Sequence, residues 1–319
     1  MPTRAREVLA ALMQQYTGHP VQPQELRPVK EGASGRTIMR AHGLLGIYWT
    51  AERADNHSFL PAARGLAAQG IRVPSLLGGT WAEQDCAACL VQDLGRQDLL
   101  CLREAPSEQL REAYTAALQA LIPFHRIRPD WPLQPAFDAA LYRWEQEYFA
   151  EHFLARHMGK NAEDFLAHPA LQEMATWLAE LPRVPIHRDC QSQNIMLHAG
   201  EAWLIDFQGM RMGLAEYDVA SLLYDPYMAL PASLREDLLQ LWPQLGGKAL
   251  EPHVLAACAM QRLMQALGAF ANIGYNQQRK WYLQQISPGV AALREVALHA
   301  PESSLPAAVA ACLLPILAD

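Results

Sequence analysis

Three oxygen-bearing side chains in the stretch Pro185 to Asp225 have the types and spacing that phosphoryl transfer needs. Asp189 ends the letters HRD, Asn194 comes five residues later, and Asp206 follows the apolar run AWLI. Phosphoryl transfer requires a carboxylate that orients and deprotonates the attacking hydroxyl, and hard oxygen ligands that hold Mg²⁺ on the phosphates. We therefore predict that Asp189 is the catalytic base and that Asn194 and Asp206 bind magnesium.

These side chains meet only if the chain between them folds back on itself. Two short apolar runs, Ile195–His198 and Ala202–Ile205, are joined by a glycine-containing turn and predict a β-hairpin. The hairpin would return Asp206 to the side of Asp189, although it lies 17 positions further along the chain. Either pattern alone would also fit a surface loop, but the two in this order favour a kinase-like catalytic site.

Asp218 lies at the start of an expected helix, Tyr217–Leu223. A carboxylate at that place is expected to cap the helix by accepting hydrogen bonds from its free backbone N–H groups. A second expectation is that Asp218 braces the backbone of the catalytic loop at His187 and Arg188. His187 and Asp218 are thus predicted structural supports of the site.

Length and composition indicate a globular chain. Of its 319 residues, 51% are hydrophobic and 18% charged, which suits a packed core in one large domain or in two lobes. A net charge of -7 without a basic run predicts that no nucleic acid is bound. The most apolar segment, Leu305 to Ala318, is shorter than the roughly 20 residues that cross a bilayer, so no membrane span is predicted.

Six scattered cysteines, without the density of a disulfide framework, favour a reducing cytoplasm. Cys86 and Cys89 form one CxxC, but no second pair follows to complete a zinc site, and burial in a strand explains them more simply. No feature of the sequence indicates an oligomeric state.

The chain divides into a β-rich N-terminal part and a helical remainder, with the boundary near Leu94 to Asp98. Helical spacing predicts helices at Arg4–Tyr16 and Asn56–Gln69. The letters TIMRAHGLLGIYWT predict an antiparallel hairpin, and LLGGTW and CAACLVQDLG predict further strands. The predicted turns of this region are marked by Gly32, Gly35, Gly43 and Gly46.

The remainder predicts helices from Ser107 onward and then at 136–157, 164–180, 217–223, 233–241 and 252–273, with short helices after Pro288. The expected class is α+β, a two-lobed protein-kinase-like fold. Its N-lobe, 1–95, holds a small antiparallel sheet that binds the nucleotide. Its larger C-lobe, 96–319, holds the catalytic loop and the acceptor-binding helices.

The motifs HRDCQSQNIM and IDFQGMRMGLAEYDVASLLYD resemble those of the aminoglycoside phosphotransferase and choline kinase family. With VPSLLGGTW, LVQDLG, FDAALYRWEQEYFAEHFLARHMG, QRLMQALGAFANIG and WYLQQI, the chain is more specifically similar to bacterial cell-wall sugar kinases. Those kinases phosphorylate the anomeric hydroxyl of N-acetylmuramate and N-acetylglucosamine. The resemblance covers most of the chain and implies ATP and Mg²⁺ as cofactors and a small-molecule sugar as the acceptor.

The resemblance also implies where the nucleotide lies. The phosphate-covering loop corresponds to Gly32, Ala33, Ser34, Gly35 and Arg36, and the adenine-binding hinge to Gln92, Asp93 and Leu94. Protein kinases carry a lysine on the third strand that pairs with the α- and β-phosphates. The letters LLGIYWT contain none. Three cations are candidates for its role, namely Lys30, Arg36 and Arg40.

An acceptor sugar is held by directional polar contacts, and a carboxylate on it would favour an arginine. The candidate acceptor residues are Glu145, Glu147, His152, Gln191, Arg211 and Arg262. Gln191 stands where the sugar kinases usually carry histidine, and Gly209 where they often carry aspartate. A solvated helix face or a structural ion pair would explain each charged candidate as well.

Two other functions fit parts of the sequence. A kinase of aminoglycosides or other amino alcohols would use carboxylates such as Asp138, Glu145, Glu147 and Glu151 to bind a cation. A nucleotide-binding pseudokinase scaffold would explain the missing strand lysine. The presence of the base and both metal ligands favours a catalyst over a scaffold.

Overall fold

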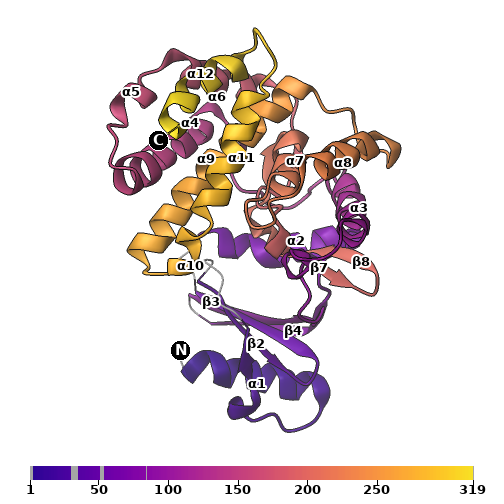
Figure 1. Cartoon of the computed structure of the whole chain (residues 1–319). Helices are drawn as coiled ribbons and strands as arrows, with labels where there is room; N and C mark the ends of the chain where they lie inside the picture. The colour runs from indigo at the N-terminus through magenta and orange to yellow at the C-terminus, as the bar shows by residue number, and fades with distance from the viewer. Residues whose placement is uncertain (1–2, 30–34, 51–53, 84, 319) are drawn as a thin grey trace.

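A computed structural model describes residues 3–29, 35–50, 54–83 and 85–318. The chain forms a two-lobed α+β fold, in which an antiparallel sheet near the N-terminus is followed by a larger, mainly helical part (Figure 1). The fold class predicted from the sequence is therefore confirmed. The lobe boundary at residue 95 stays a prediction.

The N-terminal sheet has five antiparallel strands in the order β1-β2-β3-β5-β4. Their bounds are Arg27–Pro28 (β1), Thr37–Ala41 (β2), Leu44–Thr50 (β3), Leu76–Glu83 (β4) and Cys86–Gln92 (β5). Two helices accompany them, α1 at Thr3–Thr17 and α2 at Phe59–Ala68, and 3-10 turns lie at Pro23–Glu25 and Ala54–Ser58. The expected helices and strands of this part are thus present.

Side chains on the two faces of the sheet enter different cores, because successive residues of a strand point to opposite sides. On β3, Leu44 and Tyr48 pack with α1, whereas Ile47 and Trp49 join the main core of the protein. Figure 1 shows α1 on one side of the sheet and α2 between the sheet and the helical part. The α2 face is therefore the one that can contribute to a site between the lobes.

The turn between β2 and β3 consists of His42 and Gly43, both with positive φ, 51° and 72°. Two such residues make the tight turn that matches the twist of an antiparallel hairpin. Gly46, which we expected in a turn, lies inside β3 instead. A Cβ atom there would lie 2.7 Å from Leu9 Cδ2, so this glycine allows α1 to approach the strand closely.

The helical part contains ten α-helices among the described residues: α3 (Ser107–Phe124), α4 (Ala139–Phe149), α5 (Glu163–Leu166), α6 (Pro169–Glu180), α7 (Ala215–Leu223), α8 (Ala232–Gln244), α9 (Pro252–Asn276), α10 (Lys280–Leu283), α11 (Ile286–Leu298) and α12 (Leu305–Leu317). A π-helix, Ala150–His157, continues α4, and 3-10 turns lie at Leu99–Leu102, Ser192–Asn194 and Phe207–Gly209. Four short strands pair in twos, β6 (Val184–Ile186) with β9 (Arg211–Gly213) and β7 (Ile195–His198) with β8 (Glu201–Leu204).

Several expected helices differ in detail from the observed ones. The segment predicted as one helix from 164 to 180 is broken before Pro169, which begins α6. Pro169 occupies the first helical position, where its missing N–H is not needed. The helix α10 was not predicted, and the short helices expected after Pro288 are α11, which already begins at Ile286, and α12, each of 13 residues.

Helix α9 lies at the centre of the helical part, against α4, α7 and α11. It has 25 residues and, by length and composition alone, passes as a membrane span. In its apolar window 83% is buried inside the protein, as expected for a core helix. A cytoplasmic location stays a prediction.

The main core runs from the sheet into the helical part without interruption. Trp49 on β3 meets the Phe59 ring edge-on, with centroids 5.7 Å apart. The Phe59 ring at the start of α2 stacks on Phe207, with centroids 5.4 Å apart and ring planes 10° apart. This contact joins the N-terminal part to the residue that directly follows Asp206.

Candidate active site

The catalytic loop follows β6 and is anchored to α7 by the buried carboxylate of Asp218. Its two oxygens accept hydrogen bonds from the backbone N–H groups of His187 (2.7 Å) and Arg188 (2.8 Å). His125 Nε2 donates a third hydrogen bond to Asp218, at 3.0 Å. Since α7 begins at Ala215 with Leu214 as its N-cap, Asp218 lies inside the helix, and the expected capping role is wrong.

His187 supports the loop from its other side. The side chain is fully buried, and Nε2 donates to the backbone oxygen of Ile205 at 2.9 Å. Ile205 directly precedes Asp206. His187 therefore joins the loop after β6, which carries the predicted base, to the segment after β8, which carries the predicted metal ligand.

A second buried carboxylate, Asp225, anchors the end of the loop and was not predicted. It accepts hydrogen bonds from the backbone N–H groups of Ser192 at 2.8 Å and of Tyr227 at 2.9 Å. Burial raises the pKa of Asp225, although these hydrogen bonds act in the opposite direction. The letters LLYD that end the motif stretch were its only sequence signal.

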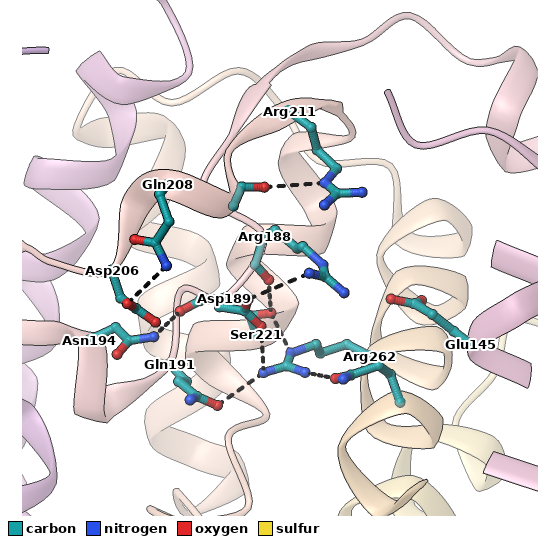
Figure 2. Close-up of polar contacts among 12 residues, drawn as sticks. Glu145, Arg188, Asp189, Gln191, Asn194, Asp206, Gln208, Arg211, Ser221 and Arg262 are labelled. Carbon is teal, nitrogen blue, oxygen red and sulfur yellow. Dashed lines mark hydrogen bonds and ion pairs between the residues drawn. The ribbon is translucent and has the colours of Figure 1, made fainter. Parts of the chain in front are cut away.

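Asp189 projects from this braced loop with 34% of its side chain exposed. Arg262 Nη2 lies 3.6 Å from Asp189 Oδ1, and Arg188 Nη1 lies 4.0 Å from Oδ2 (Figure 2). Burial raises the pKa of Asp189, but the guanidinium groups of Arg188 and Arg262 outweigh it and hold the pKa below its usual value. The side chain is therefore a carboxylate at neutral pH and able to accept a hydrogen bond from a hydroxyl.

Asn194 and Asp206 lie side by side in Figure 2, as the predicted hairpin requires. The backbone N–H of Ile205 donates to the Asn194 carbonyl at 3.0 Å, and Asn194 Nδ2 donates to the Asp189 carbonyl at 2.9 Å. With Nδ2 engaged, Asn194 keeps its side-chain oxygen for a ligand. Asp206 has a left-handed backbone, with φ of 65°, an uncommon conformation that is often retained at functional sites.

The oxygens of Asn194 and Asp206 suit magnesium better than a softer metal. Magnesium is usually held by one or two carboxylates together with waters and substrate phosphates. Among residues 3–29, 35–50, 54–83 and 85–318, no group of three or more His, Cys, Asp or Glu is placed to hold a metal. Cys86 and Cys89 are free thiols on β5, in agreement with the simpler interpretation of the CxxC.

Only part of the predicted nucleotide loop can be placed. Gly32, Ala33 and Ser34 lie outside the described residues, while Gly35 has a positive φ of 68°. The guanidinium of Arg36 is buried and forms an ion pair with Asp206. The phosphate-covering loop therefore ends beside the predicted metal ligands.

The predicted hinge residues follow the end of β5. Asp93 is engaged by Arg40, whose Nε and Nη2 donate to the two carboxylate oxygens at 2.6 and 2.8 Å. The carbonyl of Leu94 accepts a hydrogen bond from His198 Nδ1 at 3.2 Å, and the N–H of Gln92 donates to the Ser75 carbonyl at 2.9 Å. The role of these three residues in binding adenine stays a prediction.

The two glutamates proposed for the acceptor differ in their surroundings. Glu145 is fully buried on α4, where it accepts hydrogen bonds from Tyr217 Oη at 2.7 Å and from Gln261 Nε2 at 3.2 Å. Burial raises the pKa of Glu145 to about 7, although Arg188 and the Tyr217 hydrogen bond act in the opposite direction. Glu147 is exposed and lies 3.8 Å from Arg143 Nε, so the structure does not bring it to Asp189.

Arg262 on α9 connects the catalytic loop to this buried network. Its Nε donates to Ser221 Oγ at 2.9 Å, its Nη2 donates to Gln191 Oε1 at 3.0 Å, and its Nη1 donates to Gln265. Of the predicted acceptor residues, Arg262 and Gln191 are the ones that contact each other beside Asp189. Ser221 and Gln261 were not predicted, although both lie within the segments that carry the family resemblance.

Arg211 lies on β9 at the opposite side of Asp189 from Arg262 (Figure 2). Its Nε donates to the Gly209 carbonyl at 3.2 Å, and its guanidinium lies 5.5 Å from the centre of the Phe137 ring. Burial, together with the nearby Arg188, lowers the pKa of Arg211 to about 10, so the side chain is still a cation at neutral pH. Three arginines thus surround the predicted base.

Comparison with known proteins supports a kinase. An N-acetylmuramate/N-acetylglucosamine kinase from Pseudomonas aeruginosa is 29% identical over 290 residues, 83% of this chain and 82% of the relative. A choline/ethanolamine kinase family protein from Mesorhizobium loti has a similar structure, with a TM-score of 0.60, 16% identity and 98% coverage of both chains. An amicoumacin kinase, solved with AMP-PNP and Ca²⁺, gives a TM-score of 0.63 at 13% identity, covering 86% of this chain and 88% of that one.

A protein-family model also matches the chain. The model of the phosphotransferase enzyme family matches residues 25–258, which include the sheet, the catalytic loop, both predicted metal ligands and Asp218. The kinase activity expected from the motifs is therefore shown at the level of the family. The chain belongs to the phosphotransferase enzyme family.

Proposed function

We propose that this kinase uses ATP and Mg²⁺ to phosphorylate the anomeric hydroxyl of an N-acetylated amino sugar, N-acetylmuramate or N-acetylglucosamine. The observation that carries the proposal is the positive charge around Asp189, contributed by Arg188, Arg211 and Arg262. A cationic acceptor would be repelled there, whereas a neutral or anionic sugar would not. The similarity to the Pseudomonas aeruginosa kinase supports the same substrates.

The nearby carboxylates do not offset this charge toward an acceptor. Glu145 is buried and committed to Tyr217 and Gln261, and its raised pKa leaves it partly protonated at neutral pH. Glu147 is exposed beside Arg143. An amino-alcohol or aminoglycoside kinase, which has to bind a cation, is therefore the weaker proposal.

The roles of the chain's own residues follow from their contacts. Asp189 accepts the proton of the acceptor hydroxyl and orients its oxygen toward the phosphoryl group. Arg262 holds Asp189 and Gln191 on one side of the acceptor, and Arg211 lies on the other. Asn194 and Asp206 would hold Mg²⁺, which neutralises charge on the phosphates when it is bound.

A coupled assay of ADP release tests the substrate. We would offer N-acetylmuramate, N-acetylglucosamine, choline and kanamycin at equal concentrations, and examine the product by phosphorus NMR for coupling to the anomeric proton. We expect turnover with at least one sugar and an anomeric phosphate. Turnover with kanamycin or choline, and with neither sugar, would replace the proposed acceptor by a cationic one.

The pseudokinase alternative is tested by the same assay. A scaffold that only binds nucleotide would release ADP with none of these acceptors while still binding ATP. Turnover that disappears in Asp189→Ala, with nucleotide binding retained, would exclude a scaffold.

A further inference from the structure

Strand β3 carries no lysine, so another cation has to pair with the nucleotide phosphates if the proposed function is correct. Of the three candidates, Lys30 lies outside the described residues. Arg40 is held by Asp93 through two hydrogen bonds and also donates to the Gly95 carbonyl. Arg36 remains as the described candidate whose charge is directed at the catalytic site.

Arg36 is buried between Phe59 of α2 and Asp206. Only 3% of its side chain is exposed, and its guanidinium lies 5.4 Å from the centre of the Phe59 ring. Antiparallel register continued by one residue from the Thr37–Tyr48 pair sets Arg36 opposite Trp49, on the face that joins the main core. The side chain is therefore positioned by β2 and by two aromatic neighbours.

The ion pair of Arg36 involves the carboxylate that is predicted to bind magnesium. Arg36 Nη2 contacts Asp206 Oδ1, and Gln208 Nε2 donates to the same oxygen at 3.1 Å. A guanidinium and a divalent cation on one carboxylate repel each other and compete for the same lone pairs. Arg36 and magnesium therefore cannot both neutralise Asp206 fully.

Arg36 also has hydrogen-bonding capacity that its present contacts do not use. Its buried Nε has no hydrogen-bond partner within the part of the chain that the structure describes. A buried donor without a partner is costly, and a guanidinium presents its donors in a fork that matches phosphate oxygens. A phosphate oxygen that accepts a hydrogen bond from Nε would give this donor a partner.

We propose that Arg36 is the phosphate-binding cation of this kinase and that it alternates between two partners. In the nucleotide-free protein it neutralises Asp206. When magnesium nucleotide binds, Arg36 leaves Asp206 and donates to the phosphates, and the metal takes its place on the carboxylate. The inference rests on the proposed use of ATP, and it assigns one residue both to neutralising Asp206 and to binding the nucleotide.

The test measures the binding of Mn²⁺, as a probe for magnesium, and of ADP with Mg²⁺, each by isothermal titration calorimetry. The variant Arg36→Gln removes the charge and keeps much of the length. We expect ADP to bind about tenfold more weakly or worse, because a charge-assisted hydrogen bond is lost. Mn²⁺ without nucleotide should bind more tightly than to the wild type, because its competitor on Asp206 is gone.

Two further variants keep the result interpretable. Arg4→Gln breaks an exposed ion pair with Glu83 on the other face of the sheet and should change neither affinity. Arg36→Lys retains the charge and should recover part of the ADP affinity without the gain in Mn²⁺ affinity. Thermal unfolding of each variant would identify a folding defect. If Arg36→Gln has one, the two affinities of Arg36→Lys are compared with those of the wild type instead.

The opposite signs of the two changes are decisive. If Arg36→Gln weakens both ligands or leaves Mn²⁺ binding unchanged, the exchange of partners is wrong. If it leaves ADP binding unchanged, the assignment as phosphate-binding cation is wrong. A wild-type protein that does not bind ADP at all would instead overturn the proposed use of ATP, which separates the two failures.

Discussion

The catalytic loop and the buried cluster of Glu145, Gln261 and Arg262 beside it, here called the wall, are held in different ways. Two adjacent residues of α7 hold them, one for each. Asp218 binds the loop through backbone N–H groups at His187 and Arg188. Tyr217 holds the wall through a side chain, because its hydroxyl donates a hydrogen bond to the carboxylate of Glu145. The loop is fixed by its main chain, whereas the wall is fixed by side chains that contact one another.

If the proposed acceptor binds beside Arg262, this difference separates the reaction from the choice of acceptor. A loop held by its backbone keeps its shape when neighbouring side chains change, so Asp189 and Asn194 keep their positions relative to each other. A wall built from Glu145, Gln261 and Arg262 changes its shape and charge with each substitution. One fold can therefore keep phosphoryl transfer constant while the acceptor varies.

The largest expected effect is on the reaction itself. Asp189→Asn should lower kcat by about two orders of magnitude or more, because the amide cannot accept the hydroxyl proton. Nucleotide binding should be retained, since Asp189 is not among the residues predicted to bind the nucleotide or the metal. Steady-state kinetics with the best acceptor measures the loss, and Asp237→Asn, on the exposed side of α8, is the control. A kcat reduced less than tenfold would remove Asp189 from the base role.

The second largest effect is expected at Asp218, which anchors the backbone of the catalytic loop. Asp218→Ala leaves two buried N–H groups without acceptors and should lower the free energy of unfolding by roughly 3 kcal/mol. The control is Asp138→Ala, which removes an exposed N-cap that accepts from the Leu141 N–H at 2.8 Å. That loss should be about 1 kcal/mol. Equal losses in urea denaturation would mean that the loop does not depend on its buried anchor.

The buried Glu145 should make the stability of the protein depend on pH. The folded-state pKa of Glu145 is about 7, against roughly 4.3 in an unfolded chain, so the folded state holds this proton more tightly. The associated stability is fully present below about pH 4 and is lost as the pH rises through 7. The difference amounts to roughly 4 kcal/mol.

Glu145→Gln removes this titration. The free energy of unfolding of the wild type relative to the variant should therefore fall between pH 5 and 8, as followed by urea denaturation at each pH. A difference that is constant over this range would show that Glu145 does not titrate there, and one that rises would reverse the assigned sign.

The smallest effect is the loss of one hydroxyl from the wall. Tyr217→Phe removes the hydrogen bond to Glu145 and should cost about 1 kcal/mol of unfolding free energy. Tyr114→Phe is the matched control, because the buried Tyr114 hydroxyl has no hydrogen-bond partner among the described residues. Its removal should cost nothing measurable. If the two variants lose the same amount, the contact with Glu145 does not stabilise the wall.

The same comparison explains what could be predicted from the sequence. Asp189, Asn194 and Asp206 lie within one stretch, and a hairpin of ordinary length brings them together, so local pattern is sufficient. The wall joins Glu145 to Gln261, 116 positions apart, and Gln191 to Arg262, 71 positions apart. No local pattern indicates which distant helices meet. Glu147 was grouped with Glu145 although residues two apart on a helix point to different sides, and only Glu145 is buried.

The stack of Phe59 on Phe207 has a consequence for how the two lobes and the metal site are linked. Phe207 directly follows Asp206, so a displacement of α2 relative to the helical part also moves the main chain that carries the metal ligand. A displacement of α2 and the binding of a ligand at Asp206 would then be coupled equilibria. By thermodynamic reciprocity, whatever favours one favours the other to the same extent.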